Sequence, residues 1–548
     1  MKIFRYIAAL LATTALTVLP TNAQFAAGEL VGVSDFQSTD ILATARNANS
    51  YTTARVAGMA GAFTSLGGDL ASISINPAGL GMYRTSEAGV TLGMNFSSAK
   101  FDMPYDNNSC NKLAVNNLGV AWNLYQGSGS LTSFTFGVGY NKLTDYNYNL
   151  SASTPNSVAS IADMFEQLLS GTPYGKLSTD NVYGVTSQYL WGAVLAYKNY
   201  LIDPDPDSGT EYITTSIAPD ASVAHMSQVD SRGHLGEFNI SSGFNMQNKI
   251  YYGFSIGIME LQHSKKVYYG EKYTNNGLEL DASGNVIGIG QTLPSDVPLI
   301  YTDYAQRVSA NGVGINFKAG VIYRPTSSLR LGLAFHTPTA MALDRKYQAQ
   351  MFVKGFDIPN DKYVESAGRV QYTDELYSYC EYYTPPRLML GASYTFGQKA
   401  ILSMDYEHTW YNGMALDMNE GHVAKKEYKK AIRNNFKGAS TLRAGVEVRP
   451  MPLLSLRAGY TFNGSMMRDK NAIFDNPIES RASTASFGLG LNFGNLVVDL
   501  AYVFQNTQLS TYDLFYYQNA SGSFTSASGE LTGNLHRHQA MLTVSVKM

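Results

Sequence analysis

Few side chains in this 548-residue sequence have the types and spacing that chemistry at a site requires. Asp405 and Glu407 stand two residues apart in an alternating segment, so their carboxylates share a face, as an acid–base pair would. Pairing with a nearby arginine is the interpretation we favour for them. His536 and His538 suggest a metal, but two histidines without further ligands usually mean a polar rim. We therefore predict no catalytic residue, no metal site and no cofactor.

Two further motifs lead to the same conclusion. Gly312 and Gly314 lie in a strand-like segment that no helix follows, so they do not form a nucleotide-binding turn. Cys110 and Cys380 are the only cysteines. They leave open a disulfide or two separate thiols, because spacing alone cannot establish proximity. No Ser, His and acid set can be nominated, so a hydrolase remains only as the enzymatic alternative.

The composition narrows the class of protein. Glycine (50) and tyrosine (38) are abundant, 15% of residues are charged and the net charge is −3. These values fit neither a disordered chain nor a disulfide scaffold, and they argue against a nucleic-acid partner. We expect a large ordered structure rich in aromatic and small residues.

The N-terminus indicates export. Lys2 and Arg5 precede a short apolar run over residues 6–19, and Ala23 stands before Gln24. This pattern predicts a signal peptide over residues 1–23. No later apolar stretch is long enough for a helix to cross a bilayer.

A period of two dominates the remaining chain. Ala88, Val90, Leu92, Met94 and Phe96 alternate with small or polar residues, as in a strand with one apolar face. The same pattern recurs at 118–124, 134–140, 238–244, 252–258, 313–323, 329–335, 388–396, 402–406, 442–448, 454–462, 487–493, 498–504 and 542–548. Short connections such as 247–250 and 325–328 alternate with long ones, notably 145–233, 263–308 and 338–384. Regular alternation of this kind, with about 14 strands, predicts an outer-membrane β-barrel over residues 86–548.

The two faces of the predicted strands differ in charge. A sheet in hydrocarbon must close on itself, because every backbone group there has to be paired. The apolar side chains of this closed sheet would then face lipid. The pattern assigns charges of both signs to the lumen, namely Glu237, Lys318, Arg330, Arg387, Asp405, Glu407, Arg443, Glu447, Arg457, Asp499 and Lys547. A soluble sandwich would show the same alternation, but it gives no reason for short and long connections to alternate.

Residues 24–85 do not read as strands. Between Arg55 and Leu80 the segment mixes glycines with isolated large apolar residues such as Phe63, and it ends in an Asn-Pro turn signal. It is too apolar for a solvated linker and too irregular to fold alone. We predict a plug, or hatch, inside the lumen of the barrel, which would otherwise leak.

Several stretches resemble the outer-membrane long-chain fatty-acid transport proteins of the FadL type, a family that includes aromatic-hydrocarbon channels. They are residues 55–69 and 76–80 in the hatch, residues 312–320 leading into 323–325, residues 329–339, and residues 384–387. The resemblance implies an all-β, 14-stranded transmembrane antiparallel barrel with an N-terminal hatch. It also implies uptake of hydrophobic molecules that enter among external loops and leave through a gap in the wall after the hatch shifts.

The resemblance carries over to few residues. Asn76, Pro77 and Ala78 match the hatch motif, and we add Arg55 and Phe63 from the same segment as gate residues. Residues 158–169 have helical spacing where the family has a ligand-collecting loop. The ligand-binding candidates there are Ile161, Met164, Phe165 and Leu168; packing of the loop onto itself explains them as well.

Gly137 and Gly139 are candidates for the wall gap, although simple packing within the barrel is the alternative that we favour. The expected partners are a hydrophobic small molecule and outer-membrane lipid, with the protein a monomer in a Gram-negative outer membrane and both termini periplasmic or lumenal. Two other functions stay open: surface adhesion or structural support, and a receptor for a larger apolar ligand such as haem.

Overall fold

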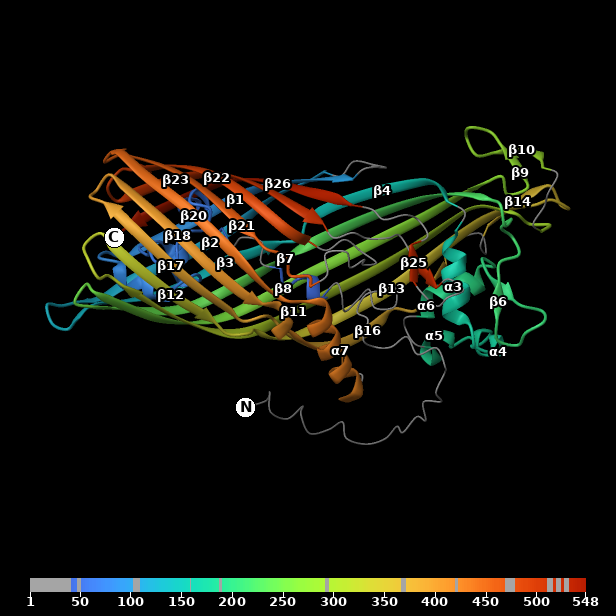
Figure 1. The fold of residues 1–548 in the computed structure, drawn as a ribbon, viewed down its shortest axis with the longest axis horizontal. Coiled ribbons are helices and arrows are strands. Elements are labelled where there is room, and N and C mark those ends of the chain that lie inside the picture. The colour runs from blue at the N-terminus through green and yellow to red at the C-terminus, as the bar shows by residue number, and fades with distance from the viewer. Residues whose placement is uncertain are drawn as a thin grey trace.

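A computed structural model shows a long antiparallel barrel with elements packed inside it and across one mouth (Figure 1). It describes residues 41–46, 51–101, 109–157, 159–186, 190–290, 295–365, 371–418, 422–468, 479–509, 516–518, 524–526 and 532–548. The predicted signal peptide, the first part of the predicted hatch and Val158 lie outside these residues.

The wall contains 14 barrel strands, as predicted. Eleven are formed mainly by single elements: β1 Glu87–Phe101, β2 Ser109–Gln126, β3 Leu131–Asp145, β7 Ser222–Met246, β8 Ile250–Thr274, β11 Leu299–Tyr323, β20 Gly438–Met451, β21 Leu454–Asn463, β22 Glu479–Asn492, β23 Leu496–Leu509 and β26 Gly533–Lys547. Three are broken into two elements: β12 Leu329–His336 with β13 Ala340–Asp357, β16 Leu376–Tyr383 with β17 Arg387–Phe396, and β18 Ala400–Trp410 with β19 Ala415–Asp417. β4 Tyr148–Ser157 continues the line of β3 along β7.

The sheet closes between its first and last strands. β1 pairs with β26 from Glu87 opposite Lys547 to Phe101 opposite Gly533, and with β2 on its other side. No edge is left at this seam, which satisfies the requirement that backbone groups in hydrocarbon be paired.

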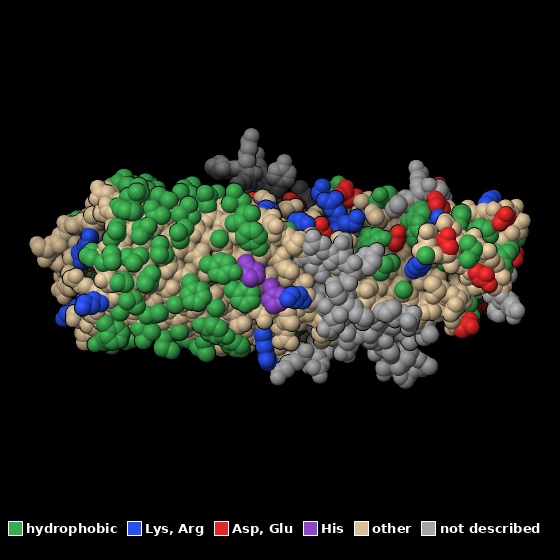
Figure 2. All heavy atoms as spheres, turned by 90° about the horizontal axis from the view of Figure 1, so that it is seen from above, with side chains coloured by type: hydrophobic (Ala, Val, Ile, Leu, Met, Phe, Trp, Pro, Cys, Tyr) green, Lys and Arg blue, Asp and Glu red, His purple; other side chains and the backbone are tan. Residues whose placement is uncertain are grey.

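The outer surface carries a broad apolar belt near one end (Figure 2). Outward side chains such as Leu118, Ile256, Val313 and Leu442 are about half exposed, in the alternation that the sequence predicts. The predicted lumenal charges Glu237, Lys318 and Glu447 are instead almost fully buried inside the barrel. The assignment of the two faces is thus confirmed.

Short turns join strands at one end of the barrel, which we call the turn end, and longer connections lie at the opposite end, the loop end. The strands run further toward the loop end than predicted, because β8, β11, β13 and β16 extend through much of 263–308 and 338–384. The prediction of loops there was wrong. Beyond the lipid belt the outer face carries polar and tyrosine side chains, so the apolar alternation that reveals a strand is lost.

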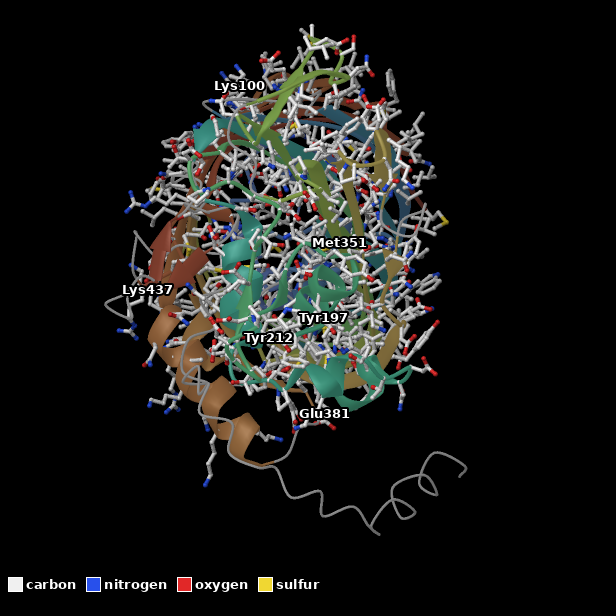
Figure 3. The ribbon with its side chains drawn as sticks, turned by 90° about the vertical axis from the view of Figure 1, so that its right-hand side faces the viewer. Lys100, Tyr197, Tyr212, Met351, Glu381 and Lys437 are labelled. Carbon is white, nitrogen blue, oxygen red and sulfur yellow. The ribbon has the colours of Figure 1, made fainter. Side chains whose placement is uncertain are left out.

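Short helices and hairpins cover the loop end. They are α3 Ile161–Leu169, α4 Tyr174–Leu177, α5 Val182–Val185, α6 Trp191–Lys198, β5 Asp203–Pro204, β6 Tyr212–Ile213, β9 Leu278–Leu280, β10 Val286–Ile289, β14 Lys362–Glu365, β15 Gln371–Tyr372, β24 Tyr516–Gln518 and β25 Phe524–Ser526. Seen from this end, Tyr197, Tyr212 and Met351 lie within the outline of the barrel (Figure 3). The helices therefore form a cap across its mouth.

Two regions complete the fold. The hatch lies inside the barrel and contains α2 Ala54–Gly58, η3 Leu70–Ile73 and η4 Pro77–Met82. Between β18 and β20 the chain forms η7 Tyr411–Gly413 and the helix α7 His422–Asn435. No helix in the described part of the chain is long and apolar enough to cross a membrane.

Candidate functional site

A collar of strand glycines receives the hatch. A Cβ atom at Gly332 would lie 2.5 Å from the Thr64 carbonyl oxygen, and one at Gly445 would lie 2.6 Å from that of Met59. The other collar positions, where hatch backbone also leaves no space, are Gly243, Gly253 and Gly459. Since no side chain fits at these points without displacement, the glycines fix where the hatch sits. The collar was not predicted from sequence, although glycines alternate visibly within the predicted strands.

The Asn76-Pro77-Ala78 motif is a buried helix cap. The Asn76 side-chain oxygen accepts a hydrogen bond from the Ala78 backbone N–H at 3.1 Å, and its amide donates to the Thr64 carbonyl at 2.7 Å. Pro77 occupies the start of η4, where its missing N–H costs nothing. Asn76 thereby ties two parts of the hatch together.

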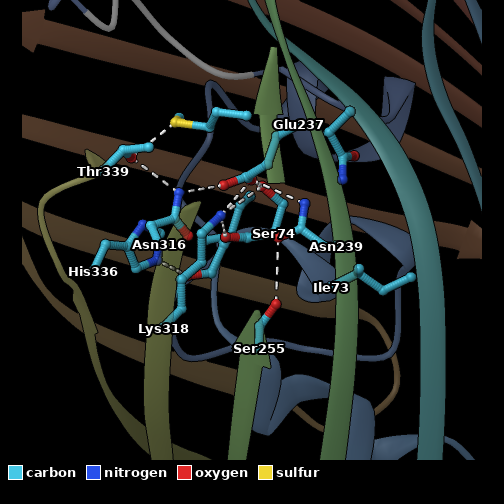
Figure 4. Close-up of polar contacts among 12 residues, drawn as sticks. Ile73, Ser74, Glu237, Asn239, Ser255, Asn316, Lys318, His336 and Thr339 are labelled. Atoms are coloured by element: carbon cyan, nitrogen blue, oxygen red, sulfur yellow. Dashed lines mark hydrogen bonds and ion pairs between the residues drawn. The ribbon is translucent and has the colours of Figure 1, made fainter. Parts of the chain in front are cut away.

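A buried ion pair fastens this part of the hatch to the wall (Figure 4). Lys318 on β11 pairs with Glu237 on β7, and its ammonium also donates to the Ser74 carbonyl at 3.0 Å. The Ser74 hydroxyl donates to Glu237 at 3.1 Å. Asn316 and Asn239 donate to the two Glu237 oxygens at 3.0 and 2.9 Å. We call these five residues the Glu237–Lys318 anchor.

Two wall residues beside this anchor hold the hatch backbone. The Ser241 hydroxyl donates to the Ile73 carbonyl at 3.0 Å, and the His336 Nε2 lies 2.9 Å from the Ile75 carbonyl. The backbone from Ile73 to Ile75 is thus hydrogen-bonded to strands on both sides of Lys318.

Arg55 forms a second anchor. Its guanidinium contacts Glu447 at 3.1 Å and lies 5.5 Å from the centroid of the Phe63 ring. Arg457 also binds Glu447, at 2.7 Å, and contacts Asp499 at 2.5 Å. Of the predicted gate residues, Arg55 therefore belongs to a network of buried charges between hatch and wall, and Phe63 packs against its guanidinium.

The third anchor corrects the prediction for Asp405. Its carboxylate accepts hydrogen bonds from the backbone N–H groups of Phe63 and Thr64, both at 2.8 Å. Glu407 does pair with an arginine, Arg443, at 2.8 Å. The expectation of an arginine partner was right for Glu407 and wrong for Asp405. The irregular hatch has backbone N–H groups without partners in a helix or sheet, and the Asp405 carboxylate in the wall accepts their hydrogen bonds.

A methionine-rich chamber lies between the hatch and the cap. Ile41, Leu42 and Ala45 are buried in it against the side chains of Met259, Met341, Tyr382, Tyr411, Met414, Met466 and Met467. The Tyr146 hydroxyl donates to the Thr44 carbonyl at 2.8 Å. The chain's own residues thus occupy an apolar space inside the lumen. The chamber was not predicted, because these methionines come from segments far apart in the chain.

A small pocket joins this chamber to the charges below it. Its lining includes Thr44, Met259 and Tyr382, together with the cations Lys318 and Arg387. The pocket is therefore lined by both apolar and cationic side chains.

The predicted ligand-collecting residues lie in the cap. Ile161, Met164 and Phe165 are buried in a cluster with α6 and the inner face of the wall, and Leu168 packs against it. The Phe165 ring meets that of Tyr304 edge to face, with centroids 5.3 Å apart. In this structure these side chains dock α3 into the mouth of the barrel.

A buried carboxylate on β8, beyond the lipid belt, holds the start of α3. Glu271 accepts hydrogen bonds from the Ser160 hydroxyl at 2.6 Å and the Ile161 N–H at 2.7 Å, besides those of two tyrosines. Burial raises the pKa of Glu271 above its ordinary value, although these donors oppose the rise. Burial also lowers the pKa of the neighbouring His225 to about 4.

The predicted wall-gap glycines are fully paired in this structure. Gly137 and Gly139 pair with β2 on one side and with β7 on the other. A Cβ at Gly137 would lie 3.1 Å from Cγ1 of Ile73 in the hatch. Both glycines make room for the hatch, and an opening at this point requires the strands to separate.

The remaining candidates lie apart from the hatch. Cys110 and Cys380 are both free thiols. His536 and His538 stack with aromatic rings of β23 on the outer surface, whereas Arg537 between them points inward and binds Glu479 at 2.5 Å.

Comparison with known proteins gives the family. A sequence search of curated proteins finds no match. Among solved structures, a FadL homologue of Pseudomonas aeruginosa aligns with a TM-score of 0.54 and 13% identity, over 90% of this chain and 98% of that one. The toluene transporter TodX of Pseudomonas putida aligns with a TM-score of 0.47 and 14% identity, over 90% and 97%. The family model described as "Outer membrane protein transport protein (OMPP1/FadL/TodX)" matches residues 188–548. The chain therefore belongs to this family of outer-membrane transport proteins.

Proposed function

We propose that this protein is a channel for passive uptake of hydrophobic small molecules such as long-chain fatty acids, gated by its N-terminal hatch. The observation that carries the proposal is the methionine-rich chamber, which Ile41, Leu42 and Ala45 fill directly above a seated hatch. An apolar ligand can take the place of these three side chains in the chamber.

The lining of the chamber suits ligands of varied shape. Methionine is unbranched and polarizable, and so adapts to different apolar partners. The adjoining pocket adds Lys318 and Arg387, for which a ligand carboxylate would compete with Glu237 and Glu407 while the tail lies among the methionines. A fatty acid satisfies both halves of this arrangement, and an aromatic hydrocarbon satisfies the apolar half.

Gating follows from the connection between chamber and hatch. Residues 41–46 precede Tyr51 by only a few positions, so a ligand that displaces them pulls on the chain leading into α2. The three anchors and the glycine collar hold the hatch until then. A ligand can shift the hatch only if it binds the protein with the hatch displaced more tightly than the protein with the hatch seated. Displacement of Ile41 and Leu42 couples ligand binding to the position of the hatch in this way.

A reversible cross-link tests this gate. The Thr461 hydroxyl donates to the Ala60 carbonyl at 2.6 Å, so these two adjoining positions are the ones to replace by cysteines. In a Cys110→Ser, Cys380→Ser background, Ala60→Cys with Thr461→Cys should abolish uptake of a labelled fatty acid when oxidised and restore it on reduction. Ala60→Cys alone is the matched control. Full uptake by the oxidised pair would contradict hatch gating.

A second measurement identifies the ligand. Native mass spectrometry of the detergent-purified protein should detect an apolar molecule at near-unit ratio, and Leu42→Trp should change its retention by filling the chamber. An empty protein that also takes up no added fatty acid would favour the surface-adhesion alternative.

A further inference from the structure

The helix α7 has a basic face that nothing in the barrel explains. Exposed cations stand at Lys425, Lys426, Lys429, Lys430 and Arg433. Successive helical residues are 100° apart, so these five positions fall within one side of the helix. Ala431 lies opposite these cations and Ile432 lies at their edge, beside Lys425; both are completely buried. The helix is therefore amphipathic, with its charge turned away from the protein.

The buried side and the end of α7 are firmly attached. Ala431, Ile432 and Phe436 pack with Met414, Leu416 and Met466 at the edge of the methionine-rich chamber. Phe436 forms a β-bridge with Met467, and the Arg468 guanidinium donates to the Arg433 carbonyl at 3.1 Å. The basic face is thus held in one place instead of moving with a free loop.

That place is the rim of the lipid belt. On β20 the outward Leu442 is more than half exposed, and it lies only four positions after Gly438, where the strand begins. Four residues span about 13 Å along a strand, and less along the barrel axis because strands tilt. The headgroup layer on each side of the hydrocarbon is about 5–8 Å thick. Asn435, the last residue of α7, lies just beyond Gly438, at the level of the headgroups.

The direction of α7 fits the same layer. In Figure 1, where the barrel axis is horizontal, the helix points away from the wall and across this axis. Seen from the loop end, it extends outside the barrel near Lys437 (Figure 3). It therefore lies beside the barrel at this level, with its buried apolar residues against the protein.

Among the side chains that the structure describes, one cation of α7 has an ion-pair partner. Lys425 binds Asp417 at 2.7 Å, while the other four cations have no ion pair among the side chains that the structure describes. Four clustered cations repel one another unless anions are near. Long loops of outer-membrane barrels face the outside of the cell, so the anions at this level belong to the outer leaflet.

We propose that α7 binds the phosphate groups of outer-leaflet glycolipid. Lys426, Lys429, Lys430 and Arg433 supply the charge, and the packed Ala431 and Ile432 hold the helix at phosphate level. The bound lipid would anchor the protein at a fixed depth and orientation, independently of what passes through the lumen.

Lipid binding by a charge-depleted helix tests the proposal. The variant K426Q/K429Q/K430Q/R433Q leaves the Lys425–Asp417 pair intact. The matched control, K176Q/K198Q/K272Q/K362Q, removes four lysines from the cap end of the molecule. Both are purified as full-length barrels, and binding of phosphorylated lipid A and of its dephosphorylated form is measured by native mass spectrometry across a salt series.

We expect the unaltered protein and the control to bind phosphorylated lipid A roughly tenfold or more above the dephosphorylated form, with binding that weakens as salt rises. The α7 variant should lose this preference, and K426R/K429R/K430R should retain it. Equal binding of the two lipids by the unaltered protein would overturn the proposal, as would equal losses in variant and control.

Resistance of the barrel to unfolding in SDS verifies that each variant is folded. Fatty-acid uptake should stay unchanged, so this result is separate from the proposed transport function.

Discussion

At the scale of residues, the Glu237–Lys318 anchor is a buried pair whose charges need each other. Removal of one partner leaves an uncompensated buried charge, which typically costs about 3–5 kcal/mol. We predict that Lys318→Met lowers the free energy of unfolding by about 3 kcal/mol or more in urea titrations of vesicle-reconstituted protein. The double variant Glu237→Gln, Lys318→Met should recover part of this loss because no charge is then stranded. A double variant no more stable than Lys318→Met would contradict the pairing.

Also at this scale, the glycine collar predicts a sharp contrast between two alanine substitutions. A Cβ at Gly253 meets the backbone of Pro77 at less than contact distance, whereas one at Gly119 has 3.6 Å to its nearest neighbour. Gly253→Ala should therefore displace the Asn76-Pro77-Ala78 segment, lower stability by about 1–3 kcal/mol and raise ion leakage. Gly119→Ala should do neither. Planar-bilayer conductance distinguishes them, and equal behaviour of the two variants would mean that the hatch is not seated as described.

At the scale of elements, α3 carries a carboxyl group whose titration should affect the cap. Burial raises the pKa of Glu166 to about 7 from 4.5, while the Thr214 hydroxyl donates to it and opposes the rise. Because the folded-state pKa is raised, the favourable contribution of Glu166 is complete below pH 4.5. It is lost as the pH rises through about 7.

We therefore predict that the cap of the unaltered protein loses stability relative to Glu166→Gln between pH 4.5 and 7. The change should be on the order of 1–2 kcal/mol, reduced because the group is partly exposed. Fluorescence of Trp191, which is buried in α6, measures it in a Trp122→Phe, Trp410→Phe background. The pKa of His225 is lowered in the folded cap, so His225 destabilises the cap as the pH falls, opposite to the effect of Glu166. Because both proteins contain His225, the difference between them isolates Glu166. A difference that does not vary with pH would contradict the prediction.

The elements also show how far sequence alone reaches. Inside the lipid belt, one side of each strand must be apolar. The alternation of apolar and polar residues therefore revealed all 14 barrel strands, and it showed that charges such as Glu237 and Glu447 point inward. Beyond the belt this constraint ends, and the extensions of β8, β11, β13 and β16 were read as loops. Contacts between distant segments leave no local pattern. For this reason the methionine chamber and the backbone partners of Asp405 emerged only in three dimensions.

At the scale of the whole molecule, the lumen is closed twice. The cap at the loop end is an apolar cluster built by α3, α6 and the wall. The hatch at the turn side is held by buried charges and by glycines that fit its backbone. Polar anchors can be released and remade at modest cost when each group finds water or another partner, whereas an apolar core resists opening. The hatch is therefore the closure that we expect to control permeation.

Two deletions separate these closures. Removal of residues 24–83 takes away the hatch together with the occupants of the chamber, and it exposes the wall charges Asp405, Glu407 and Glu447 to a lumen that water can enter. We predict open-channel currents well above the closed baseline in planar bilayers, and loss of selectivity in vesicle-swelling assays.

Removal of residues 159–217, which deletes α3 to α6, should leave the pore closed because the hatch still fills the barrel below. The second deletion is the control for general damage to the barrel, and resistance to SDS shows that each variant is assembled. If the hatch deletion inserts and stays silent while the cap deletion conducts, the cap is the seal and the hatch does not close the lumen.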